Sequence, residues 1–294
     1  MTSHDSGRDR ADRCPGVLRP WIADDGALVR LRLIGGRLPI EALERLVEVS
    51  AAHADGDLHL TKRANVQLRS IAHADGCVED AFVDAVAATG LLPSRSHELV
   101  RNVMVSPLSG RAGGRADLRP AAEQYDRLVC DDPELAALSA RFLVVLDDGR
   151  GDLVDRTLDL GAMAVSADEA QLRVGSDGWG EVVPLADLPE ALVRLAHRFL
   201  AANRGGSAWH VDELADRGAA VLGTAHARDL RTHVTALPLR HGILAQDDGR
   251  AAEHVAVPDG RLTPDLAAQV LARAHREVVV TPWRSLLLPD LENR

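Results

Sequence analysis

The chain has 294 residues, long enough to bury a substantial core, and a formal net charge of -10 at pH 7. This negative balance argues against non-specific binding to nucleic acid or to an anionic membrane, because both need basic patches that neutralise phosphate. We therefore expect small-molecule or protein partners, no nucleic acid and no membrane.

Residues 1–12 are polar and charged, and no apolar run is long enough to span a bilayer. We expect a disordered tail at 1–12 and a cytoplasmic protein. The three cysteines, Cys14, Cys77 and Cys130, contain no C-x-x-C pair, which fits a reducing compartment. An iron–sulfur (4Fe-4S) cluster held by four thiolates cannot be completed within one copy of this chain.

The first part of the chain has the order of a ferredoxin-like unit. Alternating apolar residues at 27–33 predict a strand, and Pro39 opens a helix with apolar residues at helical spacing. Two strands follow within 58–71, and a helix is predicted at 78–89. Strand, helix, strand, strand, helix is the order of a ferredoxin-like α+β half-domain, which we place at 13–90.

Residues 91–204 mix strands with covering helices. Strands are predicted at 141–146, 156–165 and 170–174, with helical stretches at 121–130 and 133–139 and a long amphipathic helix at 188–202. This mixture indicates an α/β domain.

Residues 205–229 are predicted to form a helical linker, with a helix at 209–222. Beyond it the chain repeats itself. Gly-Arg-Leu at 36–38 recurs at 260–262, each time before a predicted helix, and the Thr-x-(x)-Arg pattern at 61–63 recurs at 281–284. We interpret this as an internal duplication that places a second ferredoxin-like half-domain at 230–294. A chance match of short patterns is the alternative.

The clearest binding chemistry lies in the strand pair at 58–71. Side chains alternate between faces along a strand, so Arg63, Asn65, Gln67 and Arg69 are expected to share one face. Guanidinium and amide donors at fixed separations suit carboxylates. A solvated strand face is the alternative.

These residues resemble the nitrite and sulfite reductase family. The pattern at 61–67 resembles the family's Thr-x-Arg-x-Asn-x-Gln strand, which faces a tetrapyrrole, and 101–102 resembles its Arg-Asn segment. Residues 281–284 resemble the matching strand of the second half. Cys-Pro-Gly at 14–16 and Asp-Asp-Gly at 147–149 fit the precorrin-3B synthase branch of cobalamin biosynthesis.

The resemblance implies an α+β fold of two ferredoxin-like half-domains in pseudo-twofold arrangement plus one α/β siroheme-type domain, with the tetrapyrrole between them. The family continues into a C-terminal α/β domain that carries the cluster cysteines, and this iron–sulfur domain is expected to be missing here. The family's Pro-Arg-Lys-Phe-Lys segment becomes Ser-Ala-Arg-Phe-Leu at 139–143. Arg141 stands at the first lysine and Leu143 replaces the second, which argues against reduction of nitrite or sulfite.

The resemblance implies a precorrin-3B synthase-like oxidoreductase that binds siroheme or a precorrin-type tetrapyrrole. It would need a separate iron–sulfur subunit or electron donor. No catalytic residue is assigned, and the histidine spacing gives no metal signature. A non-catalytic tetrapyrrole-binding module, or one half of a split siroheme-dependent nitrite/sulfite reductase, is the alternative, and a degenerate fragment is the third. The expected tetrapyrrole-binding residues are Arg63, Asn65, Gln67, Arg69, Arg101, Arg141 and Arg284.

Overall fold

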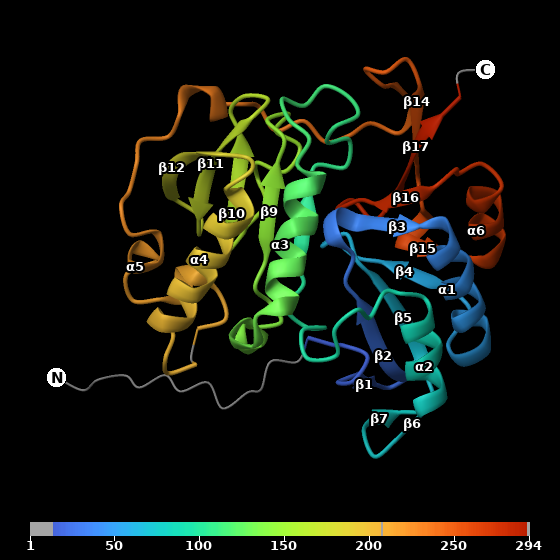
Figure 1. Ribbon diagram of the computed structural model, residues 1–294. Coiled ribbons are helices and arrows are strands. Elements are labelled where there is room, and N and C mark those ends of the chain that lie inside the picture. The colour runs from blue at the N-terminus through green and yellow to red at the C-terminus, as the bar shows by residue number, and fades with distance from the viewer. Residues whose placement is uncertain (1–13, 207, 293–294) are drawn as a thin grey trace.

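The structure is a computed structural model that describes residues 14–206 and 208–292, so the expected tail at 1–12 lies outside the described residues. The described residues form a mixed α/β structure with three five-stranded sheets, one two-stranded sheet and six α-helices (Figure 1). None of the described helices is both long and apolar enough to cross a lipid bilayer.

The first sheet is built around the strand pair that the sequence analysis singled out. Helices α1 (Ile40–His53) and α2 (Asp80–Ala88) cover one of its faces, where Leu43, Leu46 and Phe82 are buried. A two-stranded ribbon of β6 (His73–Ala74) and β7 (Cys77–Val78) precedes α2. The strand order is β1 (Trp21–Ala23), β2 (Gly26–Leu31), β5 (Val66–Ile71), β4 (Leu58–Leu60) and β15 (Arg261–Leu262).

The second sheet repeats this order with elements from the other end of the chain. It carries one helix, α6 (Pro264–Leu271). The two sheets exchange strands: β15 pairs with β4 through Leu262 and Leu58, and β3 pairs with β16 through Leu38 and Val278. The shared order agrees with the predicted duplication. The strand order is β13 (Gly242–Ala245), β14 (Ala251–Val255), β17 (Leu286–Leu291), β16 (Glu277–Val280) and β3 (Arg37–Pro39).

The two sheets differ at the position that α2 covers in the first sheet. At the equivalent position, the second sheet has an ion pair between Glu253 and Arg273. Val29 of β2 is fully buried, and its register partner is Leu68. In the second sheet Glu253 pairs in register with Leu288, and its carboxylate lies 2.6 Å from Arg273 Nη1, just beyond α6. Charged side chains are stable in contact with water, so this face of the second sheet does not need a helix to cover it.

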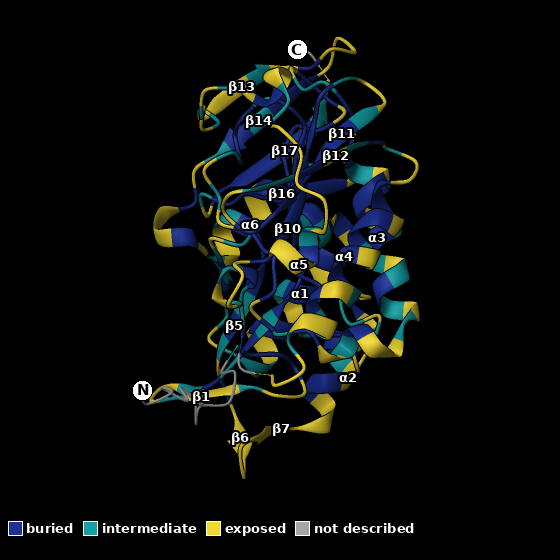
Figure 2. Cartoon of the chain, turned by 90° about the vertical axis from the view of Figure 1, so that its left-hand side faces the viewer, coloured by how far each residue is buried: buried dark blue, intermediate teal, exposed yellow. Residues whose placement is uncertain are grey.

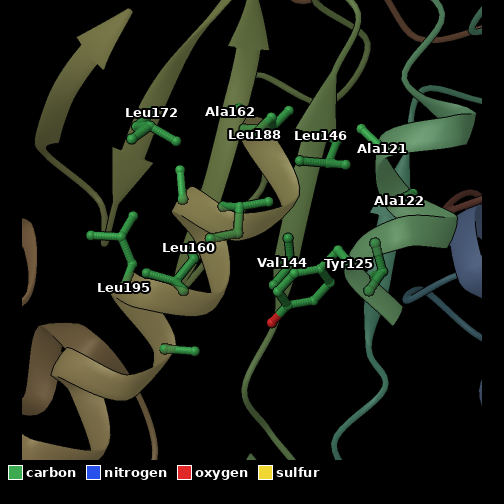
Figure 3. Close-up of a cluster of buried hydrophobic side chains, with 14 of the residues drawn as sticks. Ala121, Ala122, Tyr125, Val144, Leu146, Leu160, Ala162, Leu172, Leu188 and Leu195 are labelled. Atoms are coloured by element: carbon green, nitrogen blue, oxygen red, sulfur yellow. The ribbon is translucent and has the colours of Figure 1, made fainter. Parts of the chain in front are cut away.

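The third sheet stands beside the other two and has its own core (Figure 1). Helices α3 (Arg119–Asp131) and α4 (Leu188–Ala202) pack on one face, where Tyr125 and Leu195 meet strand residues such as Val144 (Figure 3). The short helix α5 (Ala219–Leu222) lies against α4. The strand order is β12 (Gly178–Pro184), β11 (Glu169–Val174), β10 (Leu160–Ala164), β9 (Val144–Asp147) and β8 (Val103–Val105).

The predicted helix at 209–222 is wrong. The structure has only a 3-10 turn at Val211–Glu213 and the one-turn helix α5. Arg217 and Gly218 have φ of 53° and 87°, and two consecutive left-handed residues end a helix. The strands are mostly buried and the outer helix faces exposed (Figure 2), the usual division for helices on sheets.

Candidate functional site

A hydrogen-bonded turn between β4 and β5 presents Arg63. Thr61 N donates to the Asn65 carbonyl at 2.9 Å, and Ala64 N donates to the Thr61 carbonyl at 3.1 Å. The Thr61 hydroxyl oxygen accepts from the backbone N–H groups of Arg63 and Asn65 at 3.3 and 3.1 Å. The threonine of the motif therefore fixes the turn, and the arginine two residues later projects from it.

Arg63 reaches the third sheet's side of the molecule. Its Nη1 donates to the carbonyl oxygen of Arg141 at 2.9 Å, in the segment that leads into β9. The Arg141 guanidinium carbon lies 4.5 Å from the centre of the Trp209 ring, within range of a cation–π interaction. The structure thus brings these two predicted site residues together, from sequence positions 78 residues apart.

Asn65 ties the strand to its surroundings. It is 1% exposed, and its Oδ1 accepts from Leu33 N at 2.9 Å. Its Nδ2 lies 3.5 Å from Asn102 Oδ1, and Asn102 Nδ2 donates to the Ala140 carbonyl at 3.0 Å. The two motif segments at 61–67 and 101–102 therefore meet through their asparagines.

Gln67 belongs to a polar row that crosses the first sheet. Its register partners are Arg30 on β2 and His59 on β4, and His59 pairs in turn with Arg261 on β15. With the Gln67 amide oriented to satisfy both groups, its oxygen accepts from Arg30 Nε and Nη2 at 3.2 and 2.8 Å. The predicted polar face exists, and Arg30 belongs to it.

Arg69 lies away from this junction. Its Nη2 is 3.1 Å from Asp25 Oδ2, and both side chains are about two-fifths exposed. Ser70 has a left-handed φ of 57°, and the register between β2 and β5 shifts beside it. The alternation of buried and partly exposed residues holds from Val66 to Arg69 and breaks at Ser70, so Arg69 shares a face with Gln67 but lies farther along β5 from the turn.

Arg101 is directed toward α3. It is 7% exposed, and its Nε and Nη2 donate to the two carboxylate oxygens of Asp126, each at 2.7 Å. The pair is a bidentate, charge-assisted contact within the third sheet's layer. Its neighbour Asn102, and not Arg101, makes the contact with the first sheet.

The turn at 281–284 repeats the turn at 61–64, but with a different residue in the place of Arg63. Thr281 N donates to the Ser285 carbonyl at 2.9 Å, and Arg284 N donates to the Thr281 carbonyl at 3.0 Å. Arg284 therefore corresponds to Ala64, with φ of 60° against 56°, and Trp283 corresponds to Arg63. Matching Arg284 with Arg63 was wrong by one residue. Arg284 is exposed, and its Nη1 donates to the Asp259 carbonyl at 3.1 Å.

Arg30 and Arg32 were missed by the sequence analysis. They alternate with the buried Val29 and Leu31, so both point to the polar face of the first sheet. Burial first, and then the positive charge of Arg30, lower the pKa of Arg32 to about 10. The signal was present as two arginines at alternate positions beside the strand that carries Gln67.

The position of the family's second lysine is apolar. Leu143 is 5% exposed and packs with Met104, Val145 and Leu158 on the face of the third sheet opposite its helices. Its N–H donates to Asp159 Oδ2 at 2.8 Å. Burial raises the pKa of the Asp159 carboxyl to about 6.

A second polar cluster lies at the other end of β9. Asp147, Asp148 and Asp152 place carboxylate oxygens within 4.8 Å of one another, and all three are buried. The Ser106 hydroxyl donates to Asp152 Oδ1 at 2.6 Å. Burial raises the pKa of Asp148 to about 6 and that of Asp152 to about 7. Arg150 Nη2 lies 3.5 Å from Asp148 Oδ2, so an internal cation partly balances the cluster.

The chain is similar to known proteins in one sequence segment and in its overall fold. Residues 23–75 match the family described as nitrite/sulfite reductase ferredoxin-like half domain. This stretch contains β2, β3, α1, β4 and β5, and so includes both the turn at Arg63 and the polar row.

Among solved structures, the chain is similar to the NirA protein of Mycobacterium tuberculosis, with 20% sequence identity and a TM-score of 0.74. The similarity covers 96% of this chain and 60% of the NirA chain, so the two share a fold over nearly all of the present sequence. No curated protein matches the sequence.

Proposed function

We propose that the chain binds a polycarboxylate tetrapyrrole of the siroheme or precorrin type where the first sheet meets the segment leading into β9. The contact between Arg63 and Arg141 carries this proposal, because it brings two arginines from different sheets to one junction. Each charge-assisted hydrogen bond to a ligand carboxylate contributes about 1.5–3 kcal/mol, so three of them give a roughly micromolar site.

The proposed residues differ in how ready they are to bind. Gln67 and Arg30 lie on a half-exposed face and are hydrogen-bonded to each other. Asn65 orients the strand through its bonds to the chain. Arg69, Arg101 and Arg284 have present partners in Asp25, Asp126 and the Asp259 carbonyl, which a ligand carboxylate would have to replace.

Within the family type, we propose a precorrin-3B synthase-like oxidoreductase of cobalamin biosynthesis. The matched half domain at 23–75 and the NirA-like fold support the broader class. The apolar surroundings of Leu143 favour a large macrocyclic substrate over nitrite or sulfite, since a small anion needs a cation at that position.

We propose two ferredoxin-like half-domains at 13–90 and 230–294, related by a pseudo-twofold axis, with an α/β domain at 91–204 and a linker at 205–229. The common strand order of the first two sheets and the exchange of β3 and β15 support this division. The wide spacing of the three cysteines, with no C-x-x-C pair, supports a cytoplasmic location.

A 4Fe-4S cluster does not fit this chain by itself. Four thiolates are required and the sequence has three cysteines, of which Cys77 lies on β7 and Cys130 on α3. A cluster would have to come from a partner polypeptide or electron donor. The same shortage favours the second candidate, a non-catalytic tetrapyrrole-binding module or one half of a split nitrite/sulfite reductase.

A bound tetrapyrrole would supply the reactive ring, and the residues of this chain would bind and orient it. The Arg63 guanidinium is held by its bond to the Arg141 carbonyl, and that of Arg141 by its contact with Trp209, so both lose little freedom when a carboxylate binds. Two such anchors on different sheets determine the rotation of the ring about its own axis.

The test is an absorption titration of the full chain with siroheme and with uroporphyrin, which carries an acetate and a propionate on every pyrrole ring. We expect saturable binding that weakens at least tenfold in Arg63→Ala and in Arg141→Ala, about 1.4 kcal/mol each. Arg127→Ala is the matched control, because Arg127 is an exposed arginine of α3 whose Nε and Nη2 donate to Gln124 on the same helix.

Absence of saturable binding, or equal binding by the two variants and the control, would remove the proposed site. Turnover of precorrin-3A by the purified chain alone would contradict the need for an external cluster.

A further inference from the structure

Arg32 is a buried guanidinium whose donors are only partly used. The residue is 3% exposed, and its Nη1 donates to the Pro15 carbonyl at 3.2 Å and, more weakly, to the Arg30 carbonyl at 3.4 Å. Nε and Nη2 are buried and have no hydrogen-bond partner in the described parts of the chain. A buried charged donor without a partner costs free energy, so a residue of this kind calls for an explanation.

The charges around Arg32 add to this cost. Burial, and then the positive charge of Arg30, disfavour its protonated form; Cys14 and Glu98 favour that form, and Arg63 opposes it. Glu98 is the nearby carboxylate, but its Oε2 and Oε1 accept from Val17 N and Leu18 N at 2.6 and 3.0 Å. Arg32 therefore lies near two other guanidinium groups, those of Arg30 and Arg63. The nearby carboxylate of Glu98 is hydrogen-bonded to the backbone and not to Arg32.

The segment held by Glu98 covers Arg32. We call residues 14–19 the strap. Val17 is 1% exposed and belongs to the core of the first sheet, and a Cβ on Gly16 would lie 2.5 Å from Glu98 Oε1. A cavity of about 330 Å³ opens at the far end of the strap, lined by Arg19, Ser96, Leu99 and Trp209 among others. Trp209 also contacts Arg141, so this cavity lies beside one of the two arginines proposed to hold the tetrapyrrole.

We propose that Arg32 is a buried anchor for one carboxylate arm of the tetrapyrrole, and that the strap is the cover that shifts to admit this arm. The Pro15 carbonyl occupies Nη1 until a ligand carboxylate replaces it and also satisfies Nε or Nη2. The inference rests on the proposed function, because it assigns a new residue and a moving cover to the same site.

The anchor predicts opposite effects on stability and on binding. Replacing an unsatisfied buried cation with an apolar side chain of similar length is neutral or stabilising when no ligand is present. Arg32→Met should therefore unfold at the same temperature as the parent chain or higher. In the uroporphyrin titration it should bind at least tenfold more weakly, and coproporphyrin, which lacks the acetates, should lose less if the anchored arm is an acetate.

A purely structural Arg32 gives the reverse pattern: Arg32→Met would unfold at a lower temperature, or fail to fold, while any folded protein would bind uroporphyrin like the parent. Either result overturns the inference. If Arg63→Ala weakens binding and Arg32→Met does not, the anchor fails and the proposed function stands. If the parent chain binds neither porphyrin, the proposed function itself fails.

The cover is tested separately by Glu98→Gln, which weakens the hold on the strap and leaves Arg32 in place. We expect a faster association rate for uroporphyrin in stopped-flow absorption. An unchanged association rate would show that the strap does not control access.

Discussion

Arg37 on β3 donates from Nε to the Glu277 carboxylate on β16 at 2.8 Å, although the two residues are 240 positions apart. Arg261 on β15 makes the same bond to Asp57, beside β4. Each exchanged strand therefore brings an arginine to an acidic residue of the sheet it joins. Glu277 has an additional partner in Arg111, whose Nη2 lies 2.6 Å away and whose side chain is 5% exposed.

Glu277→Ala is expected to destabilise the protein by about 1.5–3 kcal/mol, because it removes the charge-assisted bond to the buried Arg111 guanidinium and leaves Asp290 Oδ2, at 3.5 Å, as its acidic partner. Glu123→Ala is the control: it removes a different, half-exposed partner of Arg37 and should cost less than about 1 kcal/mol. Urea unfolding followed by circular dichroism measures both. Equal losses in the two variants would contradict a special role for the buried pair.

Gly36 adjoins the exchanged strand and has no room for a side chain. Its φ is +72°, and a Cβ there would lie 2.1 Å from the Val280 carbonyl oxygen. Gly90 has φ of +79° but open space around it. Gly90→Ala should therefore cost about 1 kcal/mol from backbone strain alone, whereas Gly36→Ala should cost at least about 2 kcal/mol more. Thermal unfolding of both variants separates the clash from the strain, and similar losses would show that β3 can move.

Asp152 is expected to make stability depend on pH. Its pKa in the folded chain, about 7, lies above the unfolded value, so the folded state binds more protons and loses stability as pH rises from about 4 through 7. Asp152→Asn removes this term and should lose less stability between pH 5 and pH 8, by roughly a few kcal/mol. Melting temperatures across this range provide the measurement. Asp155→Asn, at an exposed position, is the control and should follow the parent profile.

Arg101 and Asp126 should be strongly coupled. Their side chains are 8% and 15% exposed, so removing either partner leaves a largely buried charge. Arg101→Met and Asp126→Leu should each cost about 3–5 kcal/mol, and the double variant much less than the sum. A double-mutant cycle by chemical unfolding gives the coupling energy. Additive losses would indicate that the bidentate contact contributes little.

Helices α1 and α4 and the β4–β5 pair could be predicted because each is specified by residues that are close together in the sequence. Periodic apolar residues gave α1 and α4, and the Thr-x-Arg turn gave the β4–β5 pair. The sequence could not show that β3 and β15 change sheets, since a two- or three-residue strand carries no sign of its partner. Strand β13 was missed because Gly242–Ala245 is largely exposed and lacks alternation.

The candidate site was predicted in part for the same reason. The turn fixes the backbone at Arg63, so its place between the two strands followed from the motif, whereas the partner of Arg101 lies on another element and no local pattern indicates it. Arg284 was matched to the wrong position because the two turns were aligned on their arginines. The hydrogen bonds of both turns start at the threonine. When the turns are aligned on Thr61 and Thr281, Trp283 corresponds to Arg63.

The strand exchange also determines how the chain can be divided. A cut near 205–206 would leave β3 in one fragment and its partner β16 in the other, and would separate β15 from β4 in the same way. Each fragment would then carry an unpaired sheet edge that only the other fragment can close. The chain is thus a candidate for fragment complementation, in which two fragments that do not fold alone regain their structure when they are mixed. Refolding would then show that the two fragments have associated.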